Sequence, residues 1–169
     1  MRFGYLAVWS ALTLSLMGNG TRLPNQGAIA TARGNAFVAT ADDPSAIYYN
    51  PAGLIQAAGN ELLVGGYAFT PKVTYESPNG TRSQMETETF VLPQVYYAHH
   101  EEGSRWAWGT GVYVPWGQSS DWGPSGPFPT LATRNEVEFI TGAVSAAFRV
   151  SEQLSVGAGV QFNQVKSDL

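Results

Sequence analysis

Apolar residues alternate with polar or small residues from residue 59 onward, and this period of two predicts β-strands. We expect five strands, at residues 61–75, 87–99, 106–116, 136–148 and 154–166. The last is the most regular: Leu154, Val156 and Val160 share one face, and Ser155 and Gly157 share the other. In the second strand large apolar residues occupy both faces, so its orientation stays open.

The lengths of these strands and of their connections favour a membrane protein. Each strand is longer than the ~5–6 residues common in soluble proteins, and long enough for the ~9–11 residues with which a tilted strand crosses a bilayer. Connections 76–87 and 117–135 are long, whereas turns 99–105 and 149–153 are short. Outer-membrane barrels alternate in this way, with short periplasmic turns and longer outside loops. The pattern predicts an all-β, transmembrane antiparallel β-barrel, although a soluble sandwich or lipocalin-like barrel has the same periodicity.

Two segments precede the strands. Residues 1–20 have a positive Arg2 and an apolar run from Leu6 to Met17, which is too short for a membrane helix and is typical of a signal peptide. Residues 21–58 are rich in Ala, Gly, Asn, Asp and Pro and have no sustained period. We expect them to form a compact segment with short helical turns, one of them capped by Asp42 or Asp43.

Composition narrows the possible chemistry. Charged residues are 13% of the chain, against ~25% in average soluble domains. The net charge of −4 with scattered Lys and Arg gives no basis for nucleic-acid binding, and the lack of Cys excludes thiolate sites. The cluster His99-His100-Glu101-Glu102 lacks a metal-ligand spacing, so we interpret it as a solvated turn. We expect no catalytic residue, metal or cofactor, and therefore no enzyme.

The stretch from Ala32 to Leu54 resembles the N-terminal plug of FadL-like outer-membrane transporters, which carry long-chain fatty acids and aromatic hydrocarbons. The resemblance rests on Ala41-Asp42-Asp43-Pro44-Ser45-Ala46 followed by Asn50-Pro51-Ala52-Gly53. Gly109 to Gly117 looks like the family's third strand and Leu154 to Phe162 like its fifth.

This resemblance implies a 14-strand barrel in the bacterial outer membrane, of which residues 59–169 are about the first five strands, so that the chain is a fragment. It implies a hatch at residues 21–58 that closes the lumen, with hatch or gating residues Asp42, Asp43, Asn50, Pro51, Ala52 and Gly53. The Asn50 side chain is expected to bind backbone groups of the barrel wall. Implied partners are hydrophobic small molecules and membrane lipid, and the complete barrel is expected to be monomeric.

Pro115 cannot donate to a β-ladder, so it marks either the end of the third strand or a break in pairing. FadL-like barrels have a kink in their third strand that opens the wall toward lipid, and we place such a kink at Gly109, Gly111, Pro115 and Gly117. Two other functions stay open: a structural or adhesive outer-membrane barrel without transport, and a secreted soluble β-sandwich that binds ligands.

Overall fold

The computed structural model describes residues 26–129 and 133–168. The expected export signal, residues 1–20, lies outside these ranges. Within the described residues, three short helices precede the strands: α2 (Ala28–Ala32), α3 (Ala46–Tyr49) and the 3-10 helix η1 (Pro51–Gln56). Among the described residues, no helix is long and apolar enough to cross a membrane.

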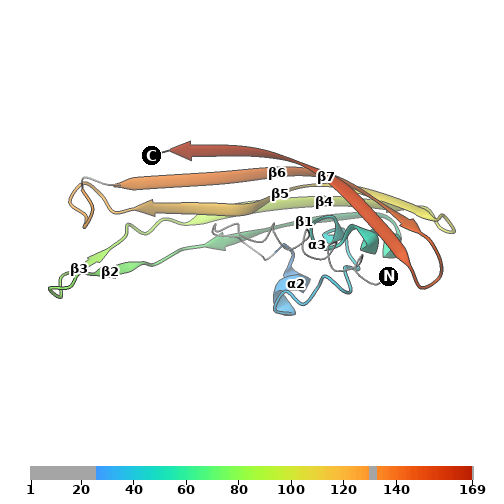
Figure 1. Ribbon diagram of the computed structural model, residues 1–169, viewed down its shortest axis with the longest axis horizontal. Helices are drawn as coiled ribbons and strands as arrows, with labels where there is room; N and C mark the ends of the chain where they lie inside the picture. The colour runs from blue at the N-terminus through green and yellow to red at the C-terminus, as the bar shows by residue number, and fades with distance from the viewer. Residues whose placement is uncertain (1–25, 130–132, 169) are drawn as a thin grey trace, which may run out of the picture.

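A five-stranded antiparallel sheet follows, in the order β1-β4-β5-β6-β7 (Figure 1). Its strands are β1 (Gly59–Phe69), β4 (Phe90–His100), β5 (Trp106–Asp121), β6 (Arg134–Arg149) and β7 (Ser155–Asp168). Each strand of this sheet pairs with the strand of the same sheet that follows it in the sequence. The five predicted strands and their antiparallel order are therefore confirmed.

Several predicted strand limits were wrong. The first strand ends at Phe69 rather than residue 75, because Pro71 has no N–H for a ladder, and the chain then forms a separate hairpin. The second strand begins at Phe90 and includes both histidines. The third continues to Asp121, since Trp116–Asp121 pair with Arg134–Phe139. Residues 117–121 and 134–135 of the predicted 117–135 loop are therefore strand: the three Pro and three Gly of this stretch suggested a loop, but the ladder extends into both of its ends.

The two faces of the sheet differ in composition. The outer face carries exposed apolar side chains, among them Leu62 (68% exposed), Val91 (70%) and Phe162 (69%). The inner face of β4 is now defined: Gln94, Tyr96 and Ala98 are buried on it, whereas Val91 and Val95 point outward. An apolar outer face suits lipid, and this separation is what a membrane barrel requires.

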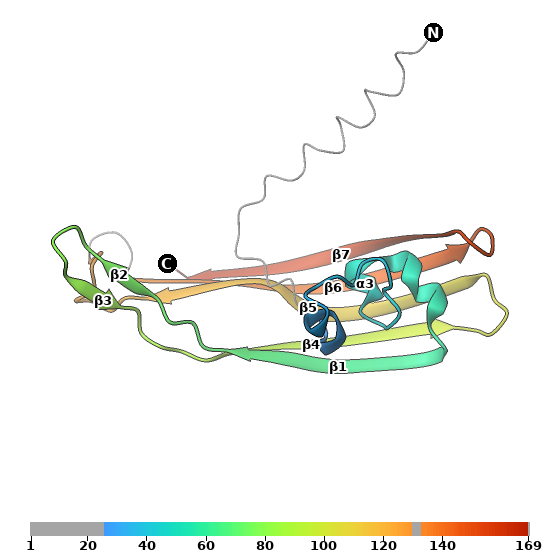
Figure 2. The ribbon, with the colours of Figure 1, turned by 90° about the horizontal axis from the view of Figure 1, so that it is seen from below.

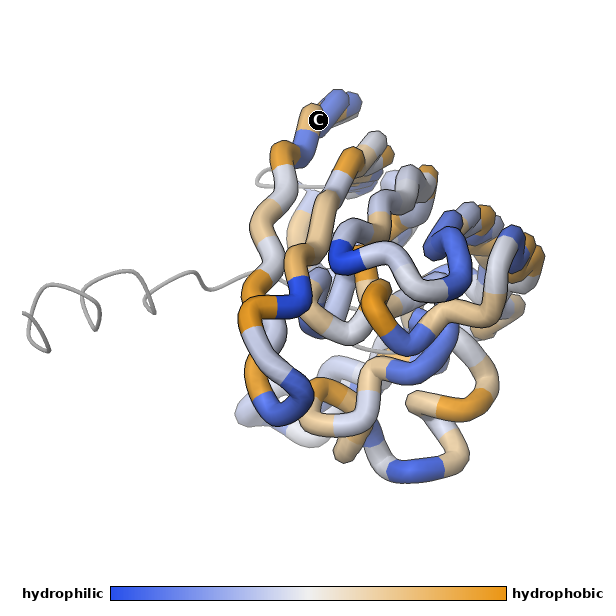
Figure 3. Tube along the Cα trace, turned by 90° about the vertical axis from the view of Figure 1, so that its right-hand side faces the viewer, coloured by the Kyte–Doolittle hydropathy of each residue, from blue (hydrophilic) through white to orange (hydrophobic). Residues whose placement is uncertain are grey.

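Residues 26–58, here called the N-terminal segment, lie against the inner face (Figures 2 and 3). Phe37, Ile47 and Leu54 of this segment are at most 2% exposed and share one core with residues of β4, β5 and β6. The wall contributes small side chains here, including Ala107, Ala143 and Ala147. Small residues on the strands let the segment come close to the sheet, so the shared core binds the two together.

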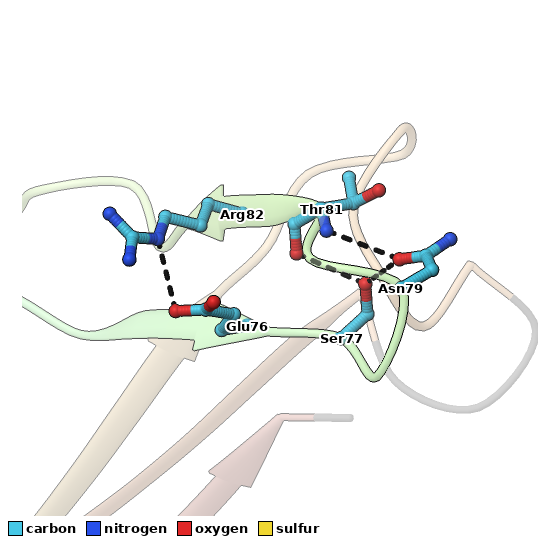
Figure 4. A network of polar contacts seen from close by, with 5 residues as sticks. All are labelled: Glu76, Ser77, Asn79, Thr81 and Arg82. Carbon is cyan, nitrogen blue, oxygen red and sulfur yellow. Dashed lines mark hydrogen bonds and ion pairs between the residues drawn. The ribbon is translucent and has the colours of Figure 1, made fainter.

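The connection from β1 to β4 contains a hairpin, β2 (Thr74–Glu76) and β3 (Arg82–Gln84). At its tip Ser77 Oγ donates to Asn79 Oδ1 and to the carbonyl of Thr81 at 3.1 Å, and Thr81 N–H donates to Asn79 Oδ1 at 3.1 Å (Figure 4). Arg82 pairs with Glu76 at 3.0 Å across the hairpin. The long connection is thus ordered by its own polar contacts.

Both long connections lie at one end of the sheet and both short turns at the other (Figure 1). Asn79 and Trp122 lie in the two long connections, which we expect to face the medium. Cysteines at Asn79 and Ser125 should therefore react with an impermeant maleimide on whole cells. A cysteine at Glu101 should react only after the outer membrane is opened. Labelling of intact cells at 101 alone would reverse this topology.

Candidate functional site

The aspartates of the N-terminal segment have different environments. Asp43 Oδ1 accepts hydrogen bonds from Ser45 N at 2.7 Å and from Ser45 Oγ at 2.6 Å, just before α3 begins at Ala46. Asp42 is exposed. Asp43 therefore orders the turn that precedes α3. The N-cap residue of α3 is Ser45 and no side chain caps this helix, so the expected aspartate cap was wrong.

Asn50 has the extended backbone expected before a proline, with φ −161° and ψ 96°. Its Nδ2 donates to the carbonyl of Val38 at 3.1 Å, and its Oδ1 accepts from Ala52 N at 3.2 Å. Both bonds lie inside the N-terminal segment, so the predicted contact with the wall backbone was wrong. Pro51 occupies the first turn of η1, where no donor is needed, so the Asn side chain is left to cap this helix.

Close contacts with the N-terminal segment explain three glycines, two of them through backbone atoms and Gly109 through a side chain. A Cβ on Gly53 would lie 2.2 Å from the carbonyl oxygen of Ala41. On the wall, a Cβ on Gly157 would lie 2.3 Å from Ala52 N, and one on Gly109 would lie 2.9 Å from Ile47 Cδ1. The segment and the strands therefore touch at glycines of the wall, which bulkier residues would push apart.

Gly111 makes room for a contact between two strands of the wall. A Cβ there would lie 2.4 Å from the ring of Tyr96. Tyr96 in turn stacks on Tyr113, with ring centroids 5.4 Å apart.

The pairing of β5 is interrupted near Pro115. On one side, β4–β5 pairing ends at Val95 and Val112. On the other, the partners jump from Tyr113–Thr141 to Trp116–Phe139, so that Val114 and Pro115 lie opposite Ile140 alone. Two residues opposite one is a β-bulge, which bends the strand. Pro115 is thus inside a longer strand at a bulge, and it does not mark the strand end.

Beyond the Val95–Val112 pair, β4 and β5 no longer pair with each other, but each stays paired with its other neighbour. Residues Phe90–Gln94 of β4 remain paired with β1, and Trp116–Asp121 of β5 remain paired with β6. Farther along, Glu86 N–H donates to the carbonyl of Asp121 at 2.8 Å. The gap is therefore bounded by backbone bonds at both ends, and we call it the wall opening.

A cavity of about 510 Å³ occupies this region. Its apolar lining includes Phe69, Val73, Met85, Phe90, Leu92 and Val114. Gly117 also lines it, as do Trp122, Glu136 and Glu138. The volume is typical of small-molecule sites, which span ~300–1,000 Å³. We call it the wall pocket.

Sequence reasoning missed Gln26, which links the N-terminal segment to the wall opening. Its Nε2 donates to the Val114 carbonyl at 3.1 Å, and its Oε1 accepts from Tyr96 OH at 3.0 Å. Gln26 thus bonds a carbonyl at the bulge. No local pattern identifies such a residue, because its partners are 70 and 88 positions away.

Pro93 was also missed, although a signal existed. It lies within β4, two residues before the last partner of β5. A proline inside a strand indicates an edge or a break in pairing. The two prolines together, Pro93 and Pro115, point to the β4–β5 gap more specifically than Pro115 alone.

The structure therefore places the predicted residues in two groups. Asn50 to Gly53 lie in the N-terminal segment beside β7, and Pro115 and Gly117 lie at the wall opening. Gly109 and Gly111 are paired with both β4 and β6, so the kink expected at these two glycines was wrong: the interruption lies farther along β5.

The two adjacent histidines point to opposite faces, as expected on a strand. His100 contacts the carbonyls of Ala57 and Ser104 on the inner side, and His99 contacts Asn60. Within 26–129 and 133–168, no three His, Cys, Asp or Glu side chains gather where they could hold a metal ion.

An apolar-faced antiparallel wall with an inner covering segment defines a partial β-barrel of the outer-membrane type. Over residues 10–169 the chain matches the family described as outer membrane protein transport protein (OMPP1/FadL/TodX), and it belongs to that family. An outer membrane protein of Neisseria meningitidis serogroup B is 30% identical over 118 residues, which are 64% of this chain and 25% of that protein. The crystal structure of a Pseudomonas aeruginosa FadL homologue superposes with a TM-score of 0.69 at 23% identity, covering 88% of this chain and 38% of that one.

These matches confirm the FadL-like fold and place the protein in the bacterial outer membrane. The secreted soluble module considered from the sequence is thereby excluded. The chain spans a quarter of the Neisseria protein and 38% of the Pseudomonas chain.

The contact at Gly157 gives a stability test. Gly157→Ala should lower the free energy of unfolding by about 1–3 kcal/mol, because the added methyl group meets the backbone of Ala52. Gly142→Ala is the matched control, since a Cβ there meets nothing within 4 Å. Urea unfolding of the protein in detergent micelles measures both. Equal stabilities would mean that the segment does not press on β7.

Proposed function

We propose that this protein is a channel for the uptake of hydrophobic molecules, such as long-chain fatty acids or aromatic hydrocarbons. Residues 21–58 act as a hatch that closes the lumen, residues 1–20 direct export, and residues 59–169 form the first strands of the barrel. The substrate leaves sideways through the wall opening into lipid. We propose transport without catalysis, by a monomeric barrel in contact with membrane lipid.

The interrupted pairing between β4 and β5 carries this proposal. A closed wall gives an apolar molecule no path from the lumen to the bilayer, whereas a gap with an apolar lining does. The wall pocket lies at this gap and includes residues of both faces, Leu92 from the inner face and Val91 from the outer. A ligand there can pass between strands without crossing the polar exterior.

The contacts of the N-terminal segment support its role as a hatch. It packs on the inner face through Phe37, Ile47 and Leu54, and Arg149 Nη2 donates to the Ile55 carbonyl at 3.1 Å. Gln26 bonds Val114 at the bulge. A shift of the segment would therefore change contacts at the wall opening, which suits a hatch whose position controls release. A barrel with only a structural role has no need of this arrangement.

Filling the wall opening tests the route. Gly117→Phe places a ring in the wall pocket and should lower uptake of a labelled hydrophobic substrate about tenfold, a barrier increase of ~1.4 kcal/mol. Gly142→Phe, on the same sheet but away from the pocket, should leave uptake unchanged. Both variants should keep the heat-modifiable migration of an assembled barrel. Normal uptake by Gly117→Phe would contradict lateral release here.

Asn50 tests the hatch. Asn50→Ala removes two hydrogen bonds, worth about 0.5–1.5 kcal/mol each, and should change uptake while the barrel still assembles. Gln153→Ala, in the exposed turn before β7, is the control. Uptake equal to wild type, with normal migration on a gel, would count against a gating role for Asn50.

A further inference from the structure

The wall pocket has acidic as well as apolar residues in its lining. Glu136 and Glu138 line it along β6. A second cavity of about 270 Å³ adjoins it and shares Met85, Phe90 and Ser119 with it. Glu86, Glu88, Asp121 and Arg134 line this second cavity. Described residues around the two cavities thus include five carboxylates and one guanidinium.

That guanidinium is already engaged. Arg134 Nη2 lies 3.2 Å from Glu136 Oε2, and its Nη1 lies 4.0 Å from Asp121 Oδ2. Lys166 is opposite Glu138 in the β6–β7 register but lies outside both linings. The lining therefore offers a bound anion no unengaged cation, and its net charge is negative.

This charge pattern separates two kinds of hydrophobic substrate. A fatty acid carries a carboxylate, which loses water in an apolar pocket and is repelled by the neighbouring carboxylates. A hydrocarbon, an aromatic ring or a long-chain alcohol has no charge, so neither the loss of carboxylate hydration nor the repulsion opposes its binding. Phe69 and Phe90, with ring centroids 5.4 Å apart, and Trp122 supply aromatic contact area for such a molecule.

We propose that the wall pocket selects uncharged hydrophobic molecules and excludes those with a carboxylate, Glu136 and Glu138 being specificity-determining residues. The inference rests on the proposed uptake function and narrows its substrate class.

The test compares labelled 1-dodecanol with labelled dodecanoate, which have the same chain length and differ in charge at neutral pH. Uptake is measured in cells that carry the protein in their outer membrane, relative to cells that lack it. Wild type should favour the alcohol by about tenfold or more, equivalent to ~1.4 kcal/mol.

The double variant Glu136→Gln/Glu138→Gln should reduce this preference, mainly because dodecanoate uptake rises. Glu138→Lys should raise dodecanoate uptake further. Glu101→Gln/Glu102→Gln removes two carboxylates at the opposite end of the sheet and should keep the wild-type ratio. Equal uptake of both probes by wild type, or an unchanged ratio in both pocket variants, would overturn the charge selection while leaving transport intact. Uptake of neither probe by wild type would overturn the proposed transport and this inference with it.

Discussion

Hydrocarbon offers no hydrogen-bonding partner to a peptide group, so a sheet in the outer membrane keeps its N–H and C=O groups paired between strands. Most of this wall meets that requirement: β6 and β7 are paired at fourteen positions, from Glu136–Asp168 to Arg149–Ser155. The β4–β5 seam does not, because pairing stops at Val95 and Val112. The exception is limited by the Val95–Val112 pair on one side and the Glu86–Asp121 bond on the other, so it forms an opening and not a free edge.

Several features compensate for the break. Pro93 and Pro115 have no N–H to leave unpaired. The Val114 carbonyl accepts from Gln26, so a residue outside the sheet satisfies a backbone group at the bulge. Gln26 is held by Tyr96, which stacks on Tyr113. The inner covering segment and the break in the wall are therefore parts of one hydrogen-bonded arrangement, and this link is the physical basis for the proposed control of release.

The sequence predicted the elements that depend on local pattern. Period-two alternation located all five strands, and Asp43 before Pro44 located the turn that precedes α3. Strand limits were missed where the local composition favoured a loop. The Pro and Gly residues of 117–135 predicted a loop, although residues 117–121 pair with β6. Hydrogen bonds between residues far apart in the sequence could not be predicted from a local pattern. Examples are the bonds from Asn50 to Val38 and from Gln26 to Val114.

The most direct measurement of the interrupted seam is amide hydrogen exchange of the protein in lipid nanodiscs, followed by mass spectrometry. Unpaired amides exchange faster than amides in a continuous ladder. We expect peptides covering residues 90–94 and 113–117 to exchange faster than those covering 95–100 and 106–112. Uniform protection along β4 and β5 would mean that the two strands are paired throughout, and it would contradict an opening in the wall.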